Sequence, residues 1–196
     1  MKEQTGNIAY AEGYLSELIS SLEKVDLGEV DAAIELLMEA HKRGSKIFTA
    51  GNGGSSATAS HIVCDFNKGI SVHTEEKFEM ICLSDSIPTL TAIANDCGYD
   101  QVFVLPLKGR MKNGDILIAI SGSGKSKNIL NAAEYAKSLG NKVIAFTGYS
   151  GGPLYEMADV KIHLPLDDMQ KAEDAHMILL HLISRAIADR YGIKMC

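Results

Sequence analysis

The chain has 196 residues, 46% hydrophobic and 22% charged, with a net charge of −6 at pH 7. These values fit a single globular domain, and the acidic balance argues against a nucleic-acid or anionic-membrane surface as the main function. No apolar run approaches the roughly 20 residues that a membrane span requires, and the first residues lack the apolar core of a signal peptide. We therefore expect one cytoplasmic domain over residues 1–196, with no nucleic-acid or membrane partner.

The cysteines are scattered and form no Cys-x-x-Cys pair: Cys64, Cys82, Cys97 and Cys196. This spacing indicates neither a zinc knuckle nor a disulfide framework. We expect reduced and mostly buried thiols, with Cys64 as a small core residue.

Two runs of apolar residues at helical spacing begin the chain: Ile8, Leu15, Leu18, Ile19 and Leu22, then Val30, Ala33, Ile34, Leu37 and Met38. The break between them is expected at Asp26–Glu29, which contains Gly28. We predict that residues 1–43 form a two-helix arm that packs against another subunit.

Residues Lys46–Phe66 predict a strand, a glycine-rich turn and a helix: KIFTA, GNGGSS and ATASHIVCDF. KIFTA is short and apolar, which is typical of a buried parallel strand. The glycines allow the backbone to approach a ligand closely, and the N-terminus of the helix attracts phosphate. His61 and Asp65 lie four residues apart, and therefore on one face of the helix. A dinucleotide site is disfavoured because Ser56 stands where the GxGxxG fingerprint requires its third glycine.

The rest of the chain continues the alternation of strands and helices. Four more strands are expected at Phe78–Ser84, Asp115–Ser121, Lys142–Thr147 and 159–165. Helices are expected from near Pro88, and at Gln101–Arg110, Lys127–Leu139 and Asp168–Tyr191. The polar stretch 67–77 and the GYSGG sequence at 148–152 predict loops. This order predicts an α/β fold, a three-layer α/β/α sandwich with a five-stranded parallel sheet.

A second glycine/serine turn, SGSGKS at Ser121–Ser126, also follows a buried strand and opens a helix. It offers hydroxyl groups and backbone N–H groups to an anion. It is not a Walker A loop, because Ala119 stands where that motif requires glycine. Ligands of open α/β sheets bind beyond the carboxyl ends of the strands, so we expect both turns to converge on one phosphorylated small molecule.

Four segments in this order resemble the sugar isomerase (SIS) fold and, within it, the phosphoheptose isomerase family: GNGGSSATASH, ANDCGYD, ISGSGKS and EDAHMILLH. The resemblance covers nearly the whole chain. It implies an aldose–ketose isomerase that converts sedoheptulose 7-phosphate to D-glycero-D-manno-heptose 7-phosphate. It also implies a homotetramer with active sites at subunit interfaces.

The resemblance assigns roles to individual residues. It implies a phosphate site at Ser121, Gly122, Ser123 and Ser126, and further substrate contacts at Asn52, Gly53, Ser55, Asn95, Asp96 and Glu173. It implies that His61 and Asp65 line the reacting end and that His181 is an acid/base group, and we expect Asp65 and His181 to be the acid/base pair. Some members of the family hold zinc, which here would be bound by His61, Asp65, Glu173 and His181.

Two of these positions depart from the family pattern. The family has glutamate where this chain has Asp65, which is one methylene shorter, and glutamine where it has Glu173. Two imidazoles and two carboxylates still suit Zn²⁺, but the reach of the carboxylate matters for proton transfer. Glu173 and His181 are eight residues apart, about 80° round an ideal helix, so His176 is the alternative partner of Glu173.

The chemistry expected is proton transfer between C1 and C2 of the sugar through an enediol, with Zn²⁺ or an imidazole stabilising the enediolate. The sequence leaves open which of Asp65 and His181 takes the carbon-bound proton. Two alternatives also remain. One is an isomerase of another phosphosugar, which the departures at Asp65 and Glu173 leave open, and the other is a non-catalytic SIS sensor or adaptor. The second is disfavoured because the histidines and carboxylates are all present.

Overall fold

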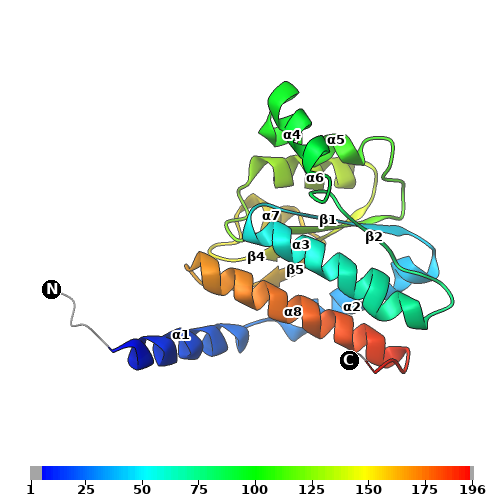
Figure 1. Cartoon of the computed structure of the whole chain (residues 1–196). Coiled ribbons are helices and arrows are strands. Elements are labelled where there is room, and N and C mark those ends of the chain that lie inside the picture. The colour runs from blue at the N-terminus through cyan, green and yellow to red at the C-terminus, as the bar shows by residue number, and fades with distance from the viewer. Residues whose placement is uncertain (1–5, 195–196) are drawn as a thin grey trace.

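A parallel sheet of five strands lies at the centre of the computed structural model, which describes residues 6–194 (Figure 1). The strands are β1 (Lys46–Gly51), β2 (Glu79–Cys82), β3 (Ile116–Ser121), β4 (Lys142–Thr147) and β5 (Val160–His163). Their order in the sheet is β2-β1-β3-β4-β5, and every neighbouring pair is parallel. The predicted five-stranded parallel sheet is therefore confirmed.

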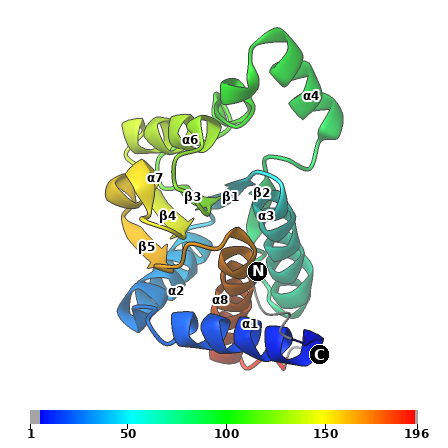
Figure 2. The same cartoon turned by 90° about the vertical axis from the view of Figure 1, so that its left-hand side faces the viewer.

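Helices cover both faces of this sheet and complete the three layers. Over residues 6–194 they are α1 (Asn7–Leu22), α2 (Leu27–Lys42), α3 (Gly54–Cys64), α4 (Ile87–Asp96), α5 (Val104–Leu107), α6 (Lys127–Ser138), α7 (Gly152–Met157) and α8 (Met169–Arg190). One face carries α2, α3 and α8, and the other carries α5, α6 and α7 (Figures 1 and 2). Each helix of the described chain is too short or too polar to span a membrane.

The strands are apolar at nearly every position because both faces of the sheet are buried. Successive side chains of a strand point to opposite faces. In β3, Ile116, Ile118 and Ile120 pack into the core under α2, α3 and α8. Leu117 and Ala119 pack into the core under α5, α6 and α7. The continuous apolar runs that predicted buried parallel strands thus divide between two separate cores.

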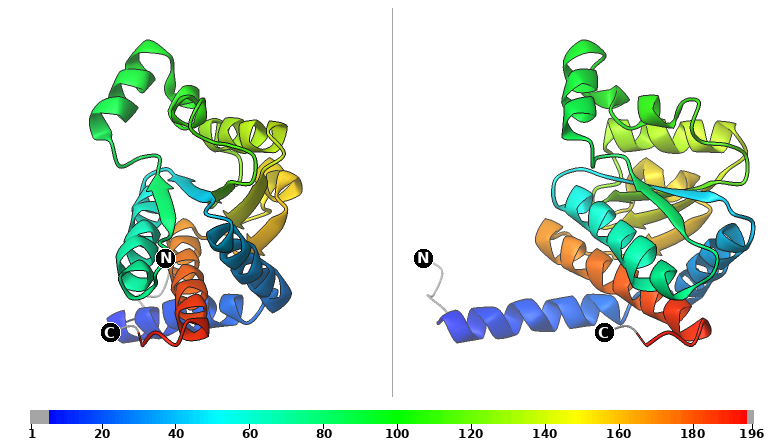
Figure 3. Two further views of the ribbon diagram at one scale, coloured as in Figure 1. Left: turned by 90° about the vertical axis from the view of Figure 1, so that its right-hand side faces the viewer. Right: turned by 45° about the vertical axis from the view of Figure 1, so that its right-hand side comes forward.

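The first helix extends beyond the body of the molecule, whereas the second is part of a layer (Figure 3). In α2, Val30, Ala33, Ile34 and Leu37 are buried in the core, so only α1 has the character of the predicted arm. The start of α8 holds α1 through two polar contacts: Lys171 pairs with Glu17, and the Tyr14 hydroxyl donates to Asp174. The outer face of α1 exposes the large apolar side chains Ile8, Leu15 and Ile19, and Tyr10 is exposed on the opposite side.

Several element boundaries differ from the prediction. The stretch 67–77 is not a simple loop, because α3 continues into a π-helical turn, Asp65–Ile70, and a 3₁₀ turn, Ser71–His73. The physical reason is that Phe66 and Ile70 are fully buried and hold this segment against the core. Helix α2 begins at Leu27, since the Asp26 side chain accepts from the Gly28 N–H (2.8 Å) and caps it.

Two further helices were mispredicted. Helix α7 was not expected; it begins at Gly152, the last residue of the expected 148–152 loop, with Pro153 in its first turn. The helix expected at Gln101–Arg110 is reduced to α5, which follows a 3₁₀ turn at Tyr99–Gln101. Helix α4 has no buried residue and projects beyond the sheet (Figure 2).

The expectation of mostly buried thiols is wrong for the described residues. Cys82 is buried, but Cys64 and Cys97 are exposed, and all three are free. Cys64 therefore lies on the outer side of α3 and is not a core residue. Cys196 lies outside the described residues, as do residues 1–5 of the predicted domain.

Candidate active site

The two glycine/serine turns meet at the carboxyl edge of the sheet. Strands β1 and β3 are neighbours, with Gly51 beside Ile120, while β2 lies on the other side of β1. The strand order therefore reverses between β1 and β3, which is where open α/β sheets bind their ligands. The turn after β1 leads into α3 and the turn after β3 leads into α6, so both helices begin at this edge.

A cleft of about 260 Å³ opens between these turns. Its lining includes eight of the predicted substrate residues: Asn52, Gly53, Ser55, Ser121, Gly122, Ser123, Ser126 and Glu173. Met169 also lines the cleft and was not predicted, although its position at the start of the last helix could have indicated it. The predicted convergence of the two turns is thus present in the fold.

Close backbone approaches hold the second turn in place. Gly124 has a positive φ of +63°, and a Cβ atom on it would lie 1.7 Å from the carbonyl oxygen of Gly151. The Leu154 N–H donates to the Gly124 carbonyl (3.1 Å). Within the turn, the Ser121 hydroxyl donates to that of Ser126 (3.3 Å). The β3–α6 turn is therefore packed directly against the β4–α7 turn and presents its hydroxyls to the cleft.

Glu173 faces the beginning of α3 across the cleft. A Cβ atom on Gly54 would lie 2.2 Å from a carboxylate oxygen of Glu173, so only glycine leaves room for this contact. The contact places a negative charge at the N-terminus of α3, which the helix dipole favours. Glu173 thus belongs to the cleft wall.

The side chain of Asn52 is held by two residues that sequence reasoning missed. Its Oδ1 accepts from Asn128 Nδ2 and from the Tyr99 hydroxyl, both at 2.8 Å. Its Nδ2 donates to Asn128 Oδ1 (3.0 Å). The identity of these partners could not be read from spacing, because they lie 76 and 47 residues away from Asn52.

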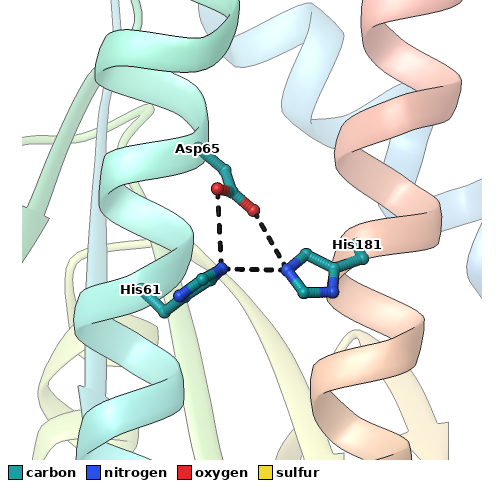
Figure 4. Close-up of side chains that lie close together, drawn as sticks. All are labelled: His61, Asp65 and His181. Carbon is teal, nitrogen blue, oxygen red and sulfur yellow. Dashed lines mark hydrogen bonds and ion pairs between the residues drawn. The ribbon is translucent and has the colours of Figure 1, made fainter. Parts of the chain in front are cut away.

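A second group of polar side chains lies between α3 and α8, where His61, Asp65 and His181 point toward one another (Figure 4). The Nε2 atoms of the two histidines are 2.9 Å apart. Asp65 Oδ1 is 3.6 Å from His61 Nε2, and Asp65 Oδ2 is 3.5 Å from His181 Nε2. The histidine side chains are 46% and 44% exposed, so small molecules can reach them. Asp65 begins the π-helical turn, a feature common at functional sites.

These three residues fit a zinc ion. Each offers one ligand atom, and the three atoms lie within 4.8 Å of one another. Two imidazole nitrogens and one carboxylate oxygen form a donor set that catalytic zinc sites use, with a further position open to water or substrate. Glu173, the fourth predicted ligand, is not among the converging side chains of residues 6–194.

Three other predicted or alternative residues lie elsewhere. Asn95 and Asp96 are exposed at the end of α4, where the Asn95 amide donates to Asp96 (2.7 Å), and neither lines the cleft. His176 is fully buried, packs edge-on against Phe146, and has no hydrogen-bond partner for either ring nitrogen. Burial lowers the pKa of His176 to about 4. His176 is therefore a core residue.

The cleft and the His–Asp–His group lie at two points along one pair of helices, since α3 and α8 run side by side (Figures 1 and 3). Gly54 and His61 are separated by seven residues of α3, and Glu173 and His181 by eight residues of α8. At 1.5 Å per residue, both paths are about 10–12 Å long. An elongated ligand could therefore contact both groups of residues.

Comparison with known proteins agrees with this architecture. The family model of the SIS domain matches residues 10–148. Phosphoheptose isomerase from Mycobacterium bovis (strain BCG / Pasteur 1173P2) is 37% identical over 165 residues, which are 84% of this chain and 84% of that protein. Phosphoheptose isomerase from Aliarcobacter butzleri is 36% identical over 159 residues, 81% of this chain and 83% of that protein.

Solved structures of phosphoheptose isomerases are also similar to this chain. Phosphoheptose isomerase from Neisseria gonorrhoeae has a TM-score of 0.85 at 28% identity, and that from Francisella tularensis has 0.88 at 27%. Each match covers 94% of this chain and 100% of the other. The chain therefore belongs to the SIS domain family and, within it, to the phosphoheptose isomerases.

Proposed function

We propose that this protein isomerises sedoheptulose 7-phosphate to D-glycero-D-manno-heptose 7-phosphate. The observation that carries the proposal is the pairing of two groups along α3 and α8. A cleft of hydroxyl and backbone N–H groups lies at one end, and His61, Asp65 and His181 lie about 10–12 Å away. Family membership gives the reaction class.

The phosphate end of the substrate belongs in the cleft. The turn at Ser121–Ser126 supplies hydroxyls, and the starts of α3 and α6 supply N–H groups and positive dipole ends. Glu173 would repel a phosphate group and instead suits the hydroxyl groups of the sugar, which can donate to its carboxylate.

The reacting end of the substrate belongs at the His–Asp–His group. One of Asp65 and His181 takes a proton from C1 of the ketose while the C2 carbonyl oxygen gains a proton, which gives the enediol. Loss of the O1 proton and delivery of a proton to C2 then give the aldose. His61 lies within hydrogen-bond distance of His181, so it orients that imidazole.

Zinc fits this proposal as a bound group. His61, Asp65 and His181 would hold Zn²⁺, which supplies positive charge for oxygens that become negative in the enediolate. Asp65 and His181 would then serve both as ligands and as the acid/base candidates. Elemental analysis of the purified protein, with turnover before and after chelation, tests this part separately.

The separation of the two groups of residues also favours a long substrate. A seven-carbon sugar phosphate is on the order of 10 Å long when extended, which matches the path along α3 and α8. Shorter ketose phosphates would leave one group without a contact. The test is turnover across four- to seven-carbon ketose phosphates. The highest kcat/KM is expected for the seven-carbon substrate, and a clear preference for a pentose or hexose phosphate would contradict the assignment.

We also propose that the protein assembles as a homotetramer through α1. The outer face of this helix exposes Leu15 and Ile19, which lie four residues apart and form an apolar surface. The double variant Leu15→Asp, Ile19→Asp should reduce the mass measured by light scattering. A tetramer that persists in this variant would contradict the assignment of α1 to the interface.

A further inference from the structure

A buried amide behind the cleft has no role in the proposed reaction. Asn128 lies in the first turn of α6, is 2% exposed and does not line the cleft. Its Nδ2 donates to Asn52 Oδ1 (2.8 Å), and its Oδ1 accepts from Asn52 Nδ2 (3.0 Å) and from the Ile129 N–H (3.0 Å). Asn128 is therefore directed at the cleft wall and is not directed at a ligand.

The pair of amides joins the two turns that form the cleft. Asn52 is the first residue after β1, in the turn that leads to α3. Asn128 follows the turn at Ser121–Ser126 by two residues and is carried by α6. Two hydrogen bonds that run in opposite directions between the same two side chains fix their orientation as well as their distance. The spacing of the turns, and with it the width of the cleft, therefore depends on this pair.

The same contacts occupy most of the hydrogen-bonding capacity of Asn52. Its Oδ1 accepts two hydrogen bonds, one from Asn128 and one from Tyr99. One N–H of its Nδ2 is used by Asn128. Because an amide oxygen has two lone pairs, this oxygen is saturated. The main contribution of the Asn52 side chain is thus to hold its own turn in place.

We propose that Asn128 is a positioning residue that acts through Asn52 to hold the two turns at the spacing the phosphosugar requires. This proposal rests on the proposed isomerase function. A buried asparagine with only a structural role would affect unfolding. A positioning residue also affects the Michaelis constant and the rate of hydrogen exchange of the backbone amides in the turn that it holds.

Kinetics of four variants test the proposal: Asn128→Ala, Asn52→Ala, the double variant, and Asn141→Ala as the matched control. Asn141 is also 2% exposed, and its Oδ1 accepts from the Gly114 N–H (2.9 Å) at the opposite, amino edge of the sheet. Loss of the two amide hydrogen bonds should raise KM for sedoheptulose 7-phosphate roughly 5- to 50-fold in Asn128→Ala. Asn141→Ala should change KM less than about twofold.

The double variant decides whether Asn128 acts through Asn52. If it does, kcat/KM of the double variant should be no lower than that of Asn52→Ala alone, because the second substitution removes a contact that the first has already lost. Losses in kcat/KM that multiply would overturn the proposal. If Asn128→Ala does not fold, Asn128→Asp keeps the acceptor for Asn52 and Ile129 but replaces the donor to Asn52 Oδ1 by a carboxylate oxygen that repels it. It should also raise KM, and an unchanged KM would count against the proposal.

Hydrogen exchange without substrate separates this proposal from the isomerase assignment. The amides of residues 52–57 should exchange faster in Asn128→Ala than in wild type and in Asn141→Ala. If the wild type turns over no ketose phosphate, the proposed function fails, yet the exchange result still stands. Unchanged exchange at 52–57 would overturn the positioning role whatever the activity.

Discussion

Replacement of His176 by leucine should remove a pH dependence from the stability of the protein and leave its activity intact. The imidazole is fully buried, and neither ring nitrogen makes a hydrogen bond of good geometry. Burial lowers its pKa from 6.5 to about 4, against a weaker opposing effect of the nearby Thr147 backbone. Between these values the unfolded chain binds a proton that the folded chain does not. The contribution of His176 to the free energy of unfolding is therefore fully present above about pH 6.5 and is lost as the pH falls toward 4.

The size of the effect follows from the two pKa values. Integration from pH 8 to pH 5 gives about 2 kcal/mol of lost unfolding free energy for one group with this shift. Urea denaturation of the wild type and of His176→Leu is carried out at both pH values and at one protein concentration. The difference between the two proteins isolates the contribution of His176, because all other titrating groups are the same in both. The wild type should lose about 2 kcal/mol more than the variant.

Two results would refute this reasoning. Equal pH dependence in the two proteins would mean that His176 titrates normally in the folded state. Loss of turnover or of bound zinc in His176→Leu at pH 8 would mean that His176, and not His181, serves the site. Leucine is the suitable replacement because it fills a similar volume against Phe146 without a polar atom.

Three further predictions concern the site itself. Ser123→Ala should weaken phosphosugar binding by roughly 1–3 kcal/mol, and an unchanged KM in the folded variant would count against the turn as phosphate site. Gly54→Ala should push the Glu173 carboxylate out of the cleft and lower kcat/KM at a cost in urea stability below about 1 kcal/mol, whereas a large stability loss would show that the backbone moves instead. His61→Ala should lower both zinc content and turnover, and His181→Ala should abolish turnover even where some zinc stays bound; activity that survives chelation would exclude the metal from the reaction.

The fold was largely predictable because the strands are short apolar runs between helix-forming segments. The KVIAFT strand has the predicted bounds, and the long last helix differs by one residue at each end. The helical continuation of α3 over residues 67–73 was missed because it lies in the polar stretch NKGISVHTEEK. Only the tertiary burial of Phe66 and Ile70 keeps that segment helical.

The candidate site was predictable to the extent that its residues lie close in the sequence. The spacing of His61 and Asp65 on one helix face was enough to bring them together. The contribution of His181 and the place of Glu173 in the cleft came from resemblance, because contacts between distant helices leave no local signal. The amide pair of Asn52 and Asn128 illustrates the limit, since neither its existence nor its partners follow from any periodicity.

The proposed reaction is tested most directly by incubating sedoheptulose 7-phosphate with the purified wild type, Asp65→Asn and His181→Ala and following the products by nuclear magnetic resonance. The wild type should form D-glycero-D-manno-heptose 7-phosphate. Both variants should retain the thermal stability of the wild type within a few degrees and lose at least about 10²-fold in kcat, because proton transfer by a positioned side chain contributes that much or more. Absence of the aldose with the wild type, or full activity in both folded variants, would contradict the assignment of this reaction to this site.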